Sequence, residues 1–145
     1  MVNILVDETK DYKEIVKIIN RPDYKEWLID KDGDVADKDL DIPNIIYYLF
    51  SVDNEVAGFC ALRKIYDDVS IADIAILEKF RGKTAKHISN VAINKYILES
   101  TCKMLITRIN KENKRSLYFA KWLGFVKYLD DDNYIYLRLK LWVEQ

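Results

Sequence analysis

The stretch NKENKRSLYFAKWLGF, residues 110–125, raises the question that leads to the fold. An amphipathic helix needs a buried stripe and a stop signal, and Gly124 is the residue type that commonly follows the end of a helix. The start of this stretch is crowded with cations, namely Lys111, Lys114 and Arg115, which an ordinary surface helix does not need. The basic start therefore requires a functional explanation, which depends on the elements around it.

Composition is typical of one soluble globular domain. The chain has 145 residues, of which 50% are hydrophobic, and only 4 are glycines and 2 prolines, which argues against disorder. The net charge of -1 gives no overall attraction for nucleic acid. No run of residues approaches the roughly 20 apolar positions of a membrane span. We expect residues 1–145 to form a single cytoplasmic domain that binds neither nucleic acid nor a membrane.

Neither the cysteines nor the acidic segment predicts a metal site. Cys60 and Cys102 match no metal or redox spacing, so we expect buried thiols in a reducing compartment. Residues 30–41, DKDGDVADKDLD, are interpreted as an acidic loop. Gly33 stands at the wrong position for a calcium-binding loop and no Glu closes it. Two interpretations of the loop stay open, simple solvation and attraction of a cationic amine.

Hydrophobic periodicity predicts an α+β fold in which helices flank a mixed sheet. Runs rich in β-branched and aromatic residues, separated by turn residues, predict a three-stranded antiparallel meander in the middle of the chain. The expected order is β-α-α-β-β-β-α-β-α-β-β. In that order the expected elements occupy residues 2–6, 7–20, 23–30, 45–52, 56–65, 69–77, 82–100, 102–109, 110–125 and the two halves of a hairpin at 125–141.

Two basic clusters follow consecutive strand-to-helix turns. In the first, Gly82 removes one side chain from the turn and Thr84 can cap the helix. The unpaired N–H groups and the positive dipole end of a helix start attract phosphate. Each cluster alone is most simply a solvated face, but two at consecutive turns favour an anionic ligand. The first cluster comprises Lys79, Arg81, Lys83 and Lys86, and the second comprises Arg108, Lys111, Lys114 and Arg115.

This order of elements resembles that of the GNAT acetyltransferases along essentially the whole chain. The family's helix-ending signature is an Asn, a small residue three positions later, and Gly-Phe eleven and twelve positions later. Asn113, Ser116 and Gly124-Phe125 match those offsets. The resemblance implies acetyl-coenzyme A in a cleft beside this helix, with Asn113 facing the pantetheine arm. The basic start of the helix would then lie near the phosphates of the cofactor.

The resemblance is weaker at the phosphate-binding turn. The family pattern begins with Arg or Gln, which Arg81 matches, but Thr84 and Lys86 stand where two small residues are expected. A shifted register, in which Gly82 and Ala85 make the close approach, is an alternative. The residues expected to bind the cofactor are Ile74, Ala75, Ile76, Arg81, Gly82, Lys83, Thr84, Ala85, Lys86, Asn113, Arg115 and Ser116.

The resemblance leaves the catalytic residues open. The family's tyrosine acid corresponds to Ala120, and Tyr118 lies about 200° away from that position around the helix. The family's frequent glutamate base corresponds to Ser70. Asp73 is the only acid in the same strand, and strand alternation sends it to the opposite face from Ser70. We take Asp73 and Tyr118 as catalytic candidates, with a partner for a nearby Lys or Arg as the alternative role of Asp73.

The leading hypothesis is an N-acetyltransferase that moves an acetyl group from acetyl-coenzyme A to a primary amine of a small molecule or a protein. Its alternative is a catalytically inactive module of the same fold that binds coenzyme A or a protein partner. Ala120, Ser70, Thr84 and Lys86 favour this alternative, because each departs from the family pattern. A homodimer is left open.

Overall fold

A computed structural model describes residues 2–24 and 34–141 of the chain. In this part of the chain, seven strands form one sheet with the order β1-β2-β3-β4-β5-β7-β6. The strands are β1 (Ile4–Thr9), β2 (Ile45–Val52), β3 (Glu55–Tyr66), β4 (Val69–Ile76), β5 (Met104–Asn110), β6 (Val126–Asp130) and β7 (Tyr134–Lys140). The helices are α1 (Lys13–Ile19), α3 (Asp37–Leu40), α4 (Lys83–Glu99) and α5 (Lys114–Trp122), with the 3₁₀ helix η1 (Glu78–Phe80) before α4.

The predicted α+β class and the antiparallel meander are confirmed. β2 pairs antiparallel with β3, and β3 pairs antiparallel with β4. The turn between β2 and β3 fixes its register through Asp53 and Asn54, whose φ angles of 50° and 68° are both left-handed. Two left-handed residues are what a two-residue type I′ hairpin turn requires, and Asp and Asn tolerate them.

Three predictions from the sequence need correction, and a fourth is tested only in part. The first strand runs Ile4–Thr9 rather than over residues 2–6, because it pairs antiparallel along its whole length with β2, and the helix predicted over residues 7–20 therefore begins only at Lys13. Residues 37–40 of the predicted acidic loop form α3, whose start is held by the Asp39 carboxylate accepting from the Ala36 N–H at 2.8 Å. Acidic side chains in a first turn favour a helix through its dipole. Of the helix predicted at 23–30, residues 23 and 24 are helical and the rest lie outside the described residues.

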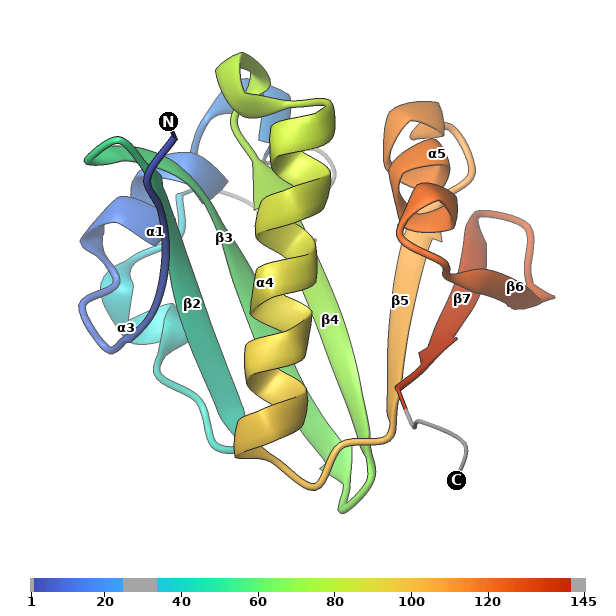
Figure 1. Ribbon diagram of the computed structural model, residues 1–145. Helices are drawn as coiled ribbons and strands as arrows, with labels where there is room; N and C mark the ends of the chain where they lie inside the picture. The colour runs from blue at the N-terminus through green and yellow to red at the C-terminus, as the bar shows by residue number, and fades with distance from the viewer. Residues whose placement is uncertain (1, 25–33, 142–145) are drawn as a thin grey trace.

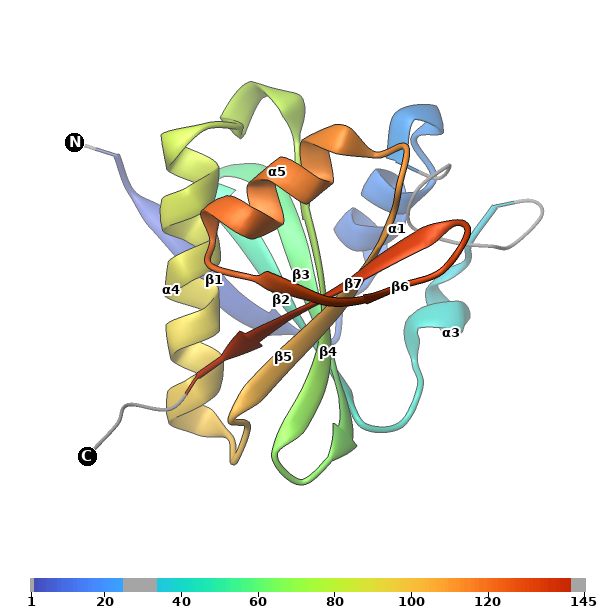
Figure 2. The same cartoon turned by 90° about the vertical axis from the view of Figure 1, so that its right-hand side faces the viewer.

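Helices cover both faces of the sheet, with α4 and α5 on one side and α1 and α3 on the other (Figure 2). Ile88 and Ala92 of α4 are fully buried in a core that includes Leu105 of β5. Ile15 of α1 is fully buried in the second core, against the opposite face. Burial of one such aliphatic side chain contributes about 1.5–3 kcal/mol. Packing of helices on both faces therefore stabilises the central strands of the sheet.

β4 and β5 separate along their length, as Figure 1 shows from the bottom of the view to the top. Their parallel pairing joins residues 69–71 to residues 104–106, and no later pair between them occurs in the described chain. The end of β4 leads through η1 into α4, and the end of β5 leads into α5. The two basic turns predicted from the sequence therefore lie at the open ends of two neighbouring strands.

α5 ends as its sequence predicts. The N–H of Phe125 donates to the Ala120 carbonyl and the N–H of Gly124 to the Lys121 carbonyl, each at 3.0 Å. Gly124 has a φ of 105°. These are the two bonds and the left-handed residue of a Schellman motif. The motif turns the chain from α5 into β6, so the Gly-Phe pair has a structural reason independent of any ligand.

Candidate active site

A cleft of about 1430 Å³ lies where β4 and β5 separate. Its walls come from β4, β5, the turn that begins α4, and α5. The cleft therefore brings together segments that are about thirty residues apart in the sequence. The predicted site residues that line it are Asp73, Ile74, Ala75, Ile76, Arg81, Gly82, Ala85, Asn113, Arg115, Ser116 and Tyr118.

The open edge of β4 presents backbone polar groups to this cleft. The N–H of Leu77 donates to the Ala57 carbonyl of the β3 side at 2.8 Å. Backbone groups of successive strand residues point to opposite sides, so those of Ile74 and Ile76 are directed away from β3. The Ile76 carbonyl accepts the Tyr24 hydroxyl at 2.6 Å, which agrees with this direction. Because β5 has already separated, the N–H and C=O of Ile74 face the cleft.

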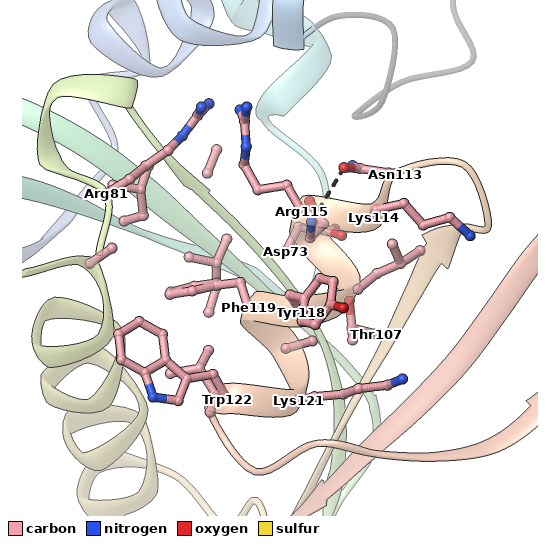
Figure 3. Close-up of a pocket in the computed structure, with 18 of the residues that line it drawn as sticks. Asp73, Arg81, Thr107, Asn113, Lys114, Arg115, Tyr118, Phe119, Lys121 and Trp122 are labelled. Carbon is pink, nitrogen blue, oxygen red and sulfur yellow. Dashed lines mark hydrogen bonds between the residues drawn. The ribbon is translucent and has the colours of Figure 1, made fainter. Parts of the chain in front are cut away.

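The turn before α4 combines a cation with open space. Gly82 is the N-cap of α4 and has a φ of 94°, and a Cβ built there would meet no atom within 4 Å. The Arg81 Nη2 donates to the Tyr24 hydroxyl at 3.0 Å. Figure 3 shows the guanidinium groups of Arg81 and Arg115 directed toward the same end of the cleft. These two cations thus lie at one end of the cleft, and the 17-residue helix α4 begins directly after Gly82.

Three residues predicted to bind the cofactor do not line the cleft, namely Lys83, Thr84 and Lys86. The Lys86 Nζ lies 4.8 Å from the centroid of the Trp122 ring, so this side chain joins α4 to α5. A cation over an aromatic face is attracted by the ring quadrupole. Gly82 and Ala85 line the cleft instead, which is the arrangement that the shifted register describes.

The start of α5 is held by Asn113. Its Oδ1 accepts the N–H of Ser116 at 3.3 Å, which makes it the N-cap of the helix (Figure 3). A capping side chain satisfies one of the donors left unpaired at a helix start. The residue predicted to face the pantetheine arm therefore also has a structural role.

Asp73 lies on the opposite face from Ser70, as strand alternation predicts. The Ser70 hydroxyl is buried 2.7 Å from the Tyr96 hydroxyl of α4. Asp73 instead lines the cleft with its side chain exposed there. Loss of water to the surrounding protein raises the pKa of its carboxyl, and the charge of Arg108 opposes that shift. Asp73 pairs with Ala61 of β3, and both Ala61 and Ala75 belong to the core against α1, so Asp73 lies on the α1 face of the sheet.

A family model described as the acetyltransferase (GNAT) family matches residues 12–125. The chain belongs to the GNAT acetyltransferase family. A search of curated proteins found no match.

Solved structures share the GNAT fold with this chain at low sequence identity. Campylobacter jejuni N-acetyltransferase PseH in complex with acetyl coenzyme A is 18% identical, with a TM-score of 0.67 over 95% of this chain and 99% of that chain. Spermidine N-acetyltransferase from Vibrio cholerae in complex with CoA and spermine is 13% identical, with a TM-score of 0.72 over 97% and 95%. A domain from Methanocaldococcus jannaschii is 17% identical, with a TM-score of 0.81 over 97% and 100%.

The position that carries a tyrosine acid in many GNAT enzymes is a buried methyl group here. Ala120 is 6% exposed and belongs to the main core, so it has no proton to give. Tyr118 lies on the rim of the cleft and is 77% exposed.

None of the helices in the described ranges is long and apolar enough to cross a membrane.

Sequence reasoning missed Tyr24, Phe119 and Trp122, all of which line the cleft of this GNAT chain. Phe119 and Trp122 form an edge-to-face pair, with ring centroids 6.3 Å apart. Their spacing of three residues on the predicted helix was a usable signal, because such residues share a helix face. No local pattern indicates that Tyr24 reaches the end of β4.

Proposed function

We propose that the protein is an N-acetyltransferase that moves the acetyl group of acetyl-coenzyme A to a primary amine of a small molecule or a protein. The observation that carries the proposal is the separation of β4 from β5, which leaves the backbone groups of Ile74 facing a cleft with cations at one end. Family membership and the complex of PseH with acetyl coenzyme A support the same cosubstrate.

The residues of the cleft fit the parts of this cosubstrate. The Ile74 N–H would donate to the thioester carbonyl and stabilise the oxyanion that develops there. Gly82 and the first N–H groups of α4 would take the pyrophosphate, with Arg81 and Arg115 supplying charge. Asn113 can offer its amide N–H₂ to the pantetheine arm while its Oδ1 caps α5. The residues that line the cleft among these are Ile74, Arg81, Gly82, Asn113 and Arg115, and the first N–H groups of α4 follow directly after Gly82.

Asp73 is the candidate base. An amine attacks a thioester only after it loses its proton, and a carboxyl whose pKa is raised accepts that proton more readily near neutral pH. The amine nitrogen then bonds to the acetyl carbon and gives up a second proton to solvent, while the C–S bond breaks and the sulfur leaves as a thiolate. Since Ala120 offers no proton, Tyr118 or water would supply one, or the thiolate would leave without protonation. Orientation of the two reactants supplies much of the remaining rate enhancement.

A second candidate function is a GNAT module that binds coenzyme A without turnover. Two observations favour it. Ala120 puts a buried methyl group where the acid is expected, and Ser70, at the position of the frequent base, is hydrogen-bonded to Tyr96 on the other face of the sheet. The module and the enzyme share the same cofactor cleft, so they differ only in turnover.

The test is a calorimetric titration with acetyl-coenzyme A and coenzyme A, followed by transfer assays on a panel of amines and lysine peptides. At a hundredfold excess of ligand over its Kd, the free energy of unfolding should rise by about 2.7 kcal/mol. Binding together with acetylation of any amine supports the enzyme. Binding without transfer across the panel favours the module, and no binding at millimolar ligand contradicts both.

A further inference from the structure

Tyr24 connects two groups of the cleft that belong to different elements. It is 7% exposed and lies in a helical turn at residues 22–24. Its hydroxyl donates to the Ile76 carbonyl at 2.6 Å, a bond between residues 52 positions apart. The Arg81 Nη2 donates to the same hydroxyl at 3.0 Å. One side-chain oxygen therefore holds the last carbonyl of β4 and the guanidinium of Arg81.

The directions of these bonds are fixed by the donors available. A neutral tyrosine hydroxyl has one hydrogen, and it goes to the Ile76 carbonyl because a carbonyl only accepts. A lone pair of the hydroxyl oxygen is then free to accept from Arg81, whose guanidinium has further N–H groups. Arg81 can thus be oriented by Tyr24 and still offer donors to an anion.

The ring of Tyr24 makes a second and weaker contact. The guanidinium carbons of Arg21 and Arg81 each lie 5.8 Å from its centroid. Replacement by phenylalanine keeps the ring and both of these contacts, and removes only the hydroxyl. The substitution Tyr24→Phe therefore isolates the two hydrogen bonds.

We infer that Tyr24 is a positioning residue for acetyl-coenzyme A, an inference that rests on the proposed function. It acts through Arg81, whose guanidinium it holds at the mouth of the cleft, and through Ile76, whose carbonyl it holds away from β3. An Arg81 side chain that is already oriented loses less rotational freedom on binding an anion, so affinity is higher. Without the hydroxyl, Arg81 is free to turn toward solvent and the end of β4 loses an anchor.

The alternative is a purely structural hydroxyl, and the chain offers a matched control for it. The Tyr47 hydroxyl donates to the Leu40 carbonyl at 2.9 Å, also within a buried contact. Tyr47 is absent from the lining of the cleft. Tyr47→Phe therefore removes a comparable bond from the folded chain without touching Arg81 or Ile76.

The experiment compares the Kd of acetyl-coenzyme A, by calorimetry, with the Tm of each variant. Tyr24→Phe should raise the Kd about tenfold, whereas Tyr47→Phe should leave it within about twofold. The effect of Tyr24→Phe should shrink in an Arg81→Ala background, because part of it is transmitted by Arg81. Arg81→Lys should also bind more weakly, since one ammonium cannot reproduce the fork of a guanidinium.

The outcomes separate this inference from the function on which it rests. A Tyr24→Phe protein that binds acetyl-coenzyme A as tightly as the wild type overturns the positioning role alone. Equal losses of affinity in Tyr24→Phe and Tyr47→Phe, in step with their Tm values, overturn it as well. If Tyr24→Phe does not fold, wild-type affinity in Arg81→Lys has the same consequence. A wild-type protein that binds no acetyl-coenzyme A overturns the proposed function and the positioning role together.

Discussion

Arg81 and Lys79 stand two positions apart in the chain but have different surroundings. Arg81 lines the cleft and is oriented by Tyr24, while Lys79 pairs on the surface with Glu55 at 2.7 Å. Arg81→Ala should weaken acetyl-coenzyme A binding by about 1.5–3 kcal/mol, the range of a hydrogen bond to a charged group. Lys79→Ala should change it little, because an exposed ion pair contributes about 0–1 kcal/mol and only to stability. Titration at two salt concentrations measures both, and equal losses that fade together in salt would indicate diffuse attraction without a defined site.

Tyr118 is an exposed side chain, whereas the Asn113 side chain makes a hydrogen bond that caps α5. Tyr118 is 77% exposed on the rim, so Tyr118→Phe should lower the rate of acetyl transfer less than tenfold, or below about 1.4 kcal/mol. Asn113→Ala should lower the transfer rate more, because it removes a polar group of the cleft. It should also lower the free energy of unfolding by about 1 kcal/mol, because it removes the cap of α5. Both variants are assayed for transfer to a panel of amines. Loss of all activity in a folded, cofactor-binding Tyr118→Phe protein would identify Tyr118 as the acid.

Some of the candidate site residues could be placed from the sequence and others could not. Asn113 and Arg81 match motifs with fixed spacing, Gly82 belongs to the shifted register that the sequence left as an alternative, and all three line the cleft. Tyr24 has partners 52 and 57 positions away, so no local spacing marks it. Lys86 was predicted from its charge near a phosphate, but the structure places its ammonium over the ring of Trp122. Their roles in binding and catalysis stay predictions.

At the scale of elements, β3 and β4 approach so closely at Gly58 that no side chain fits. A Cβ there would lie 2.1 Å from the Ala75 carbonyl oxygen, which is backbone and cannot rotate away. Gly58→Ala should therefore cost about 3 kcal/mol or more, as overpacking does when the backbone must shift. It should also weaken cofactor binding, because the displaced segment of β4 includes Ile74. Denaturant unfolding and titration with acetyl-coenzyme A measure the two effects.

Gly124→Ala is the comparison for that prediction. A Cβ at Gly124 would lie 3.3 Å from the Leu139 Cδ1, which is a side-chain methyl group that can move. Its φ of 105° still disfavours any residue with a Cβ, so a loss of about 1–2 kcal/mol is expected. A loss in Gly58→Ala no larger than that in Gly124→Ala would show that β4 yields easily, and would contradict the close approach.

The strands were predictable and their separation was not. β2 begins and ends where the β-branched and aromatic run does, because turn residues bound it on both sides. The separation of β4 from β5 has no local signal, since their pairing joins residues 69–71 to residues 104–106, far apart in the sequence. α3 was missed for a related reason, because its four residues are too few for periodicity to show and they contribute only Leu40 to a core.

At the scale of the whole molecule, net charge and local charge lead to different conclusions. A net charge of -1 gives no general attraction for anions. The fold nevertheless gathers Arg81, Arg108 and Arg115 around one cleft, from three separate elements. At physiological ionic strength charges are screened beyond about 8 Å, so this cluster acts on an anion in the cleft and hardly on one elsewhere. A protein with a net charge of -1 can therefore hold a polyanionic cosubstrate.

Asp73 links the site to the stability of the whole fold. Its pKa is raised above the ordinary carboxyl value, mainly by the surrounding protein, with Arg108 in opposition. The folded state therefore holds the proton of Asp73 more tightly than the unfolded state does. It follows that stability from this residue is fully present below about pH 4, the ordinary carboxyl range, and is lost as pH rises through the folded pKa.

Asp73→Asn removes that loss and should raise the free energy of unfolding at pH 7 relative to the wild type, with a gain that disappears toward pH 4. The same variant should lose about 10²–10⁴ of the transfer rate if Asp73 is the base. Urea unfolding of both proteins from pH 4 to pH 8 measures the difference, with Asp7→Asn, an exposed acid of β1 outside the cleft, as the control for a lost charge. The opposite sign, a variant less stable at pH 7 than the wild type, would mean that attraction to Arg108 outweighs the loss of water around the carboxylate. Asp73 would then be the ion-pair partner that its sequence alternative describes, and the base would have to be sought among the other groups of the cleft.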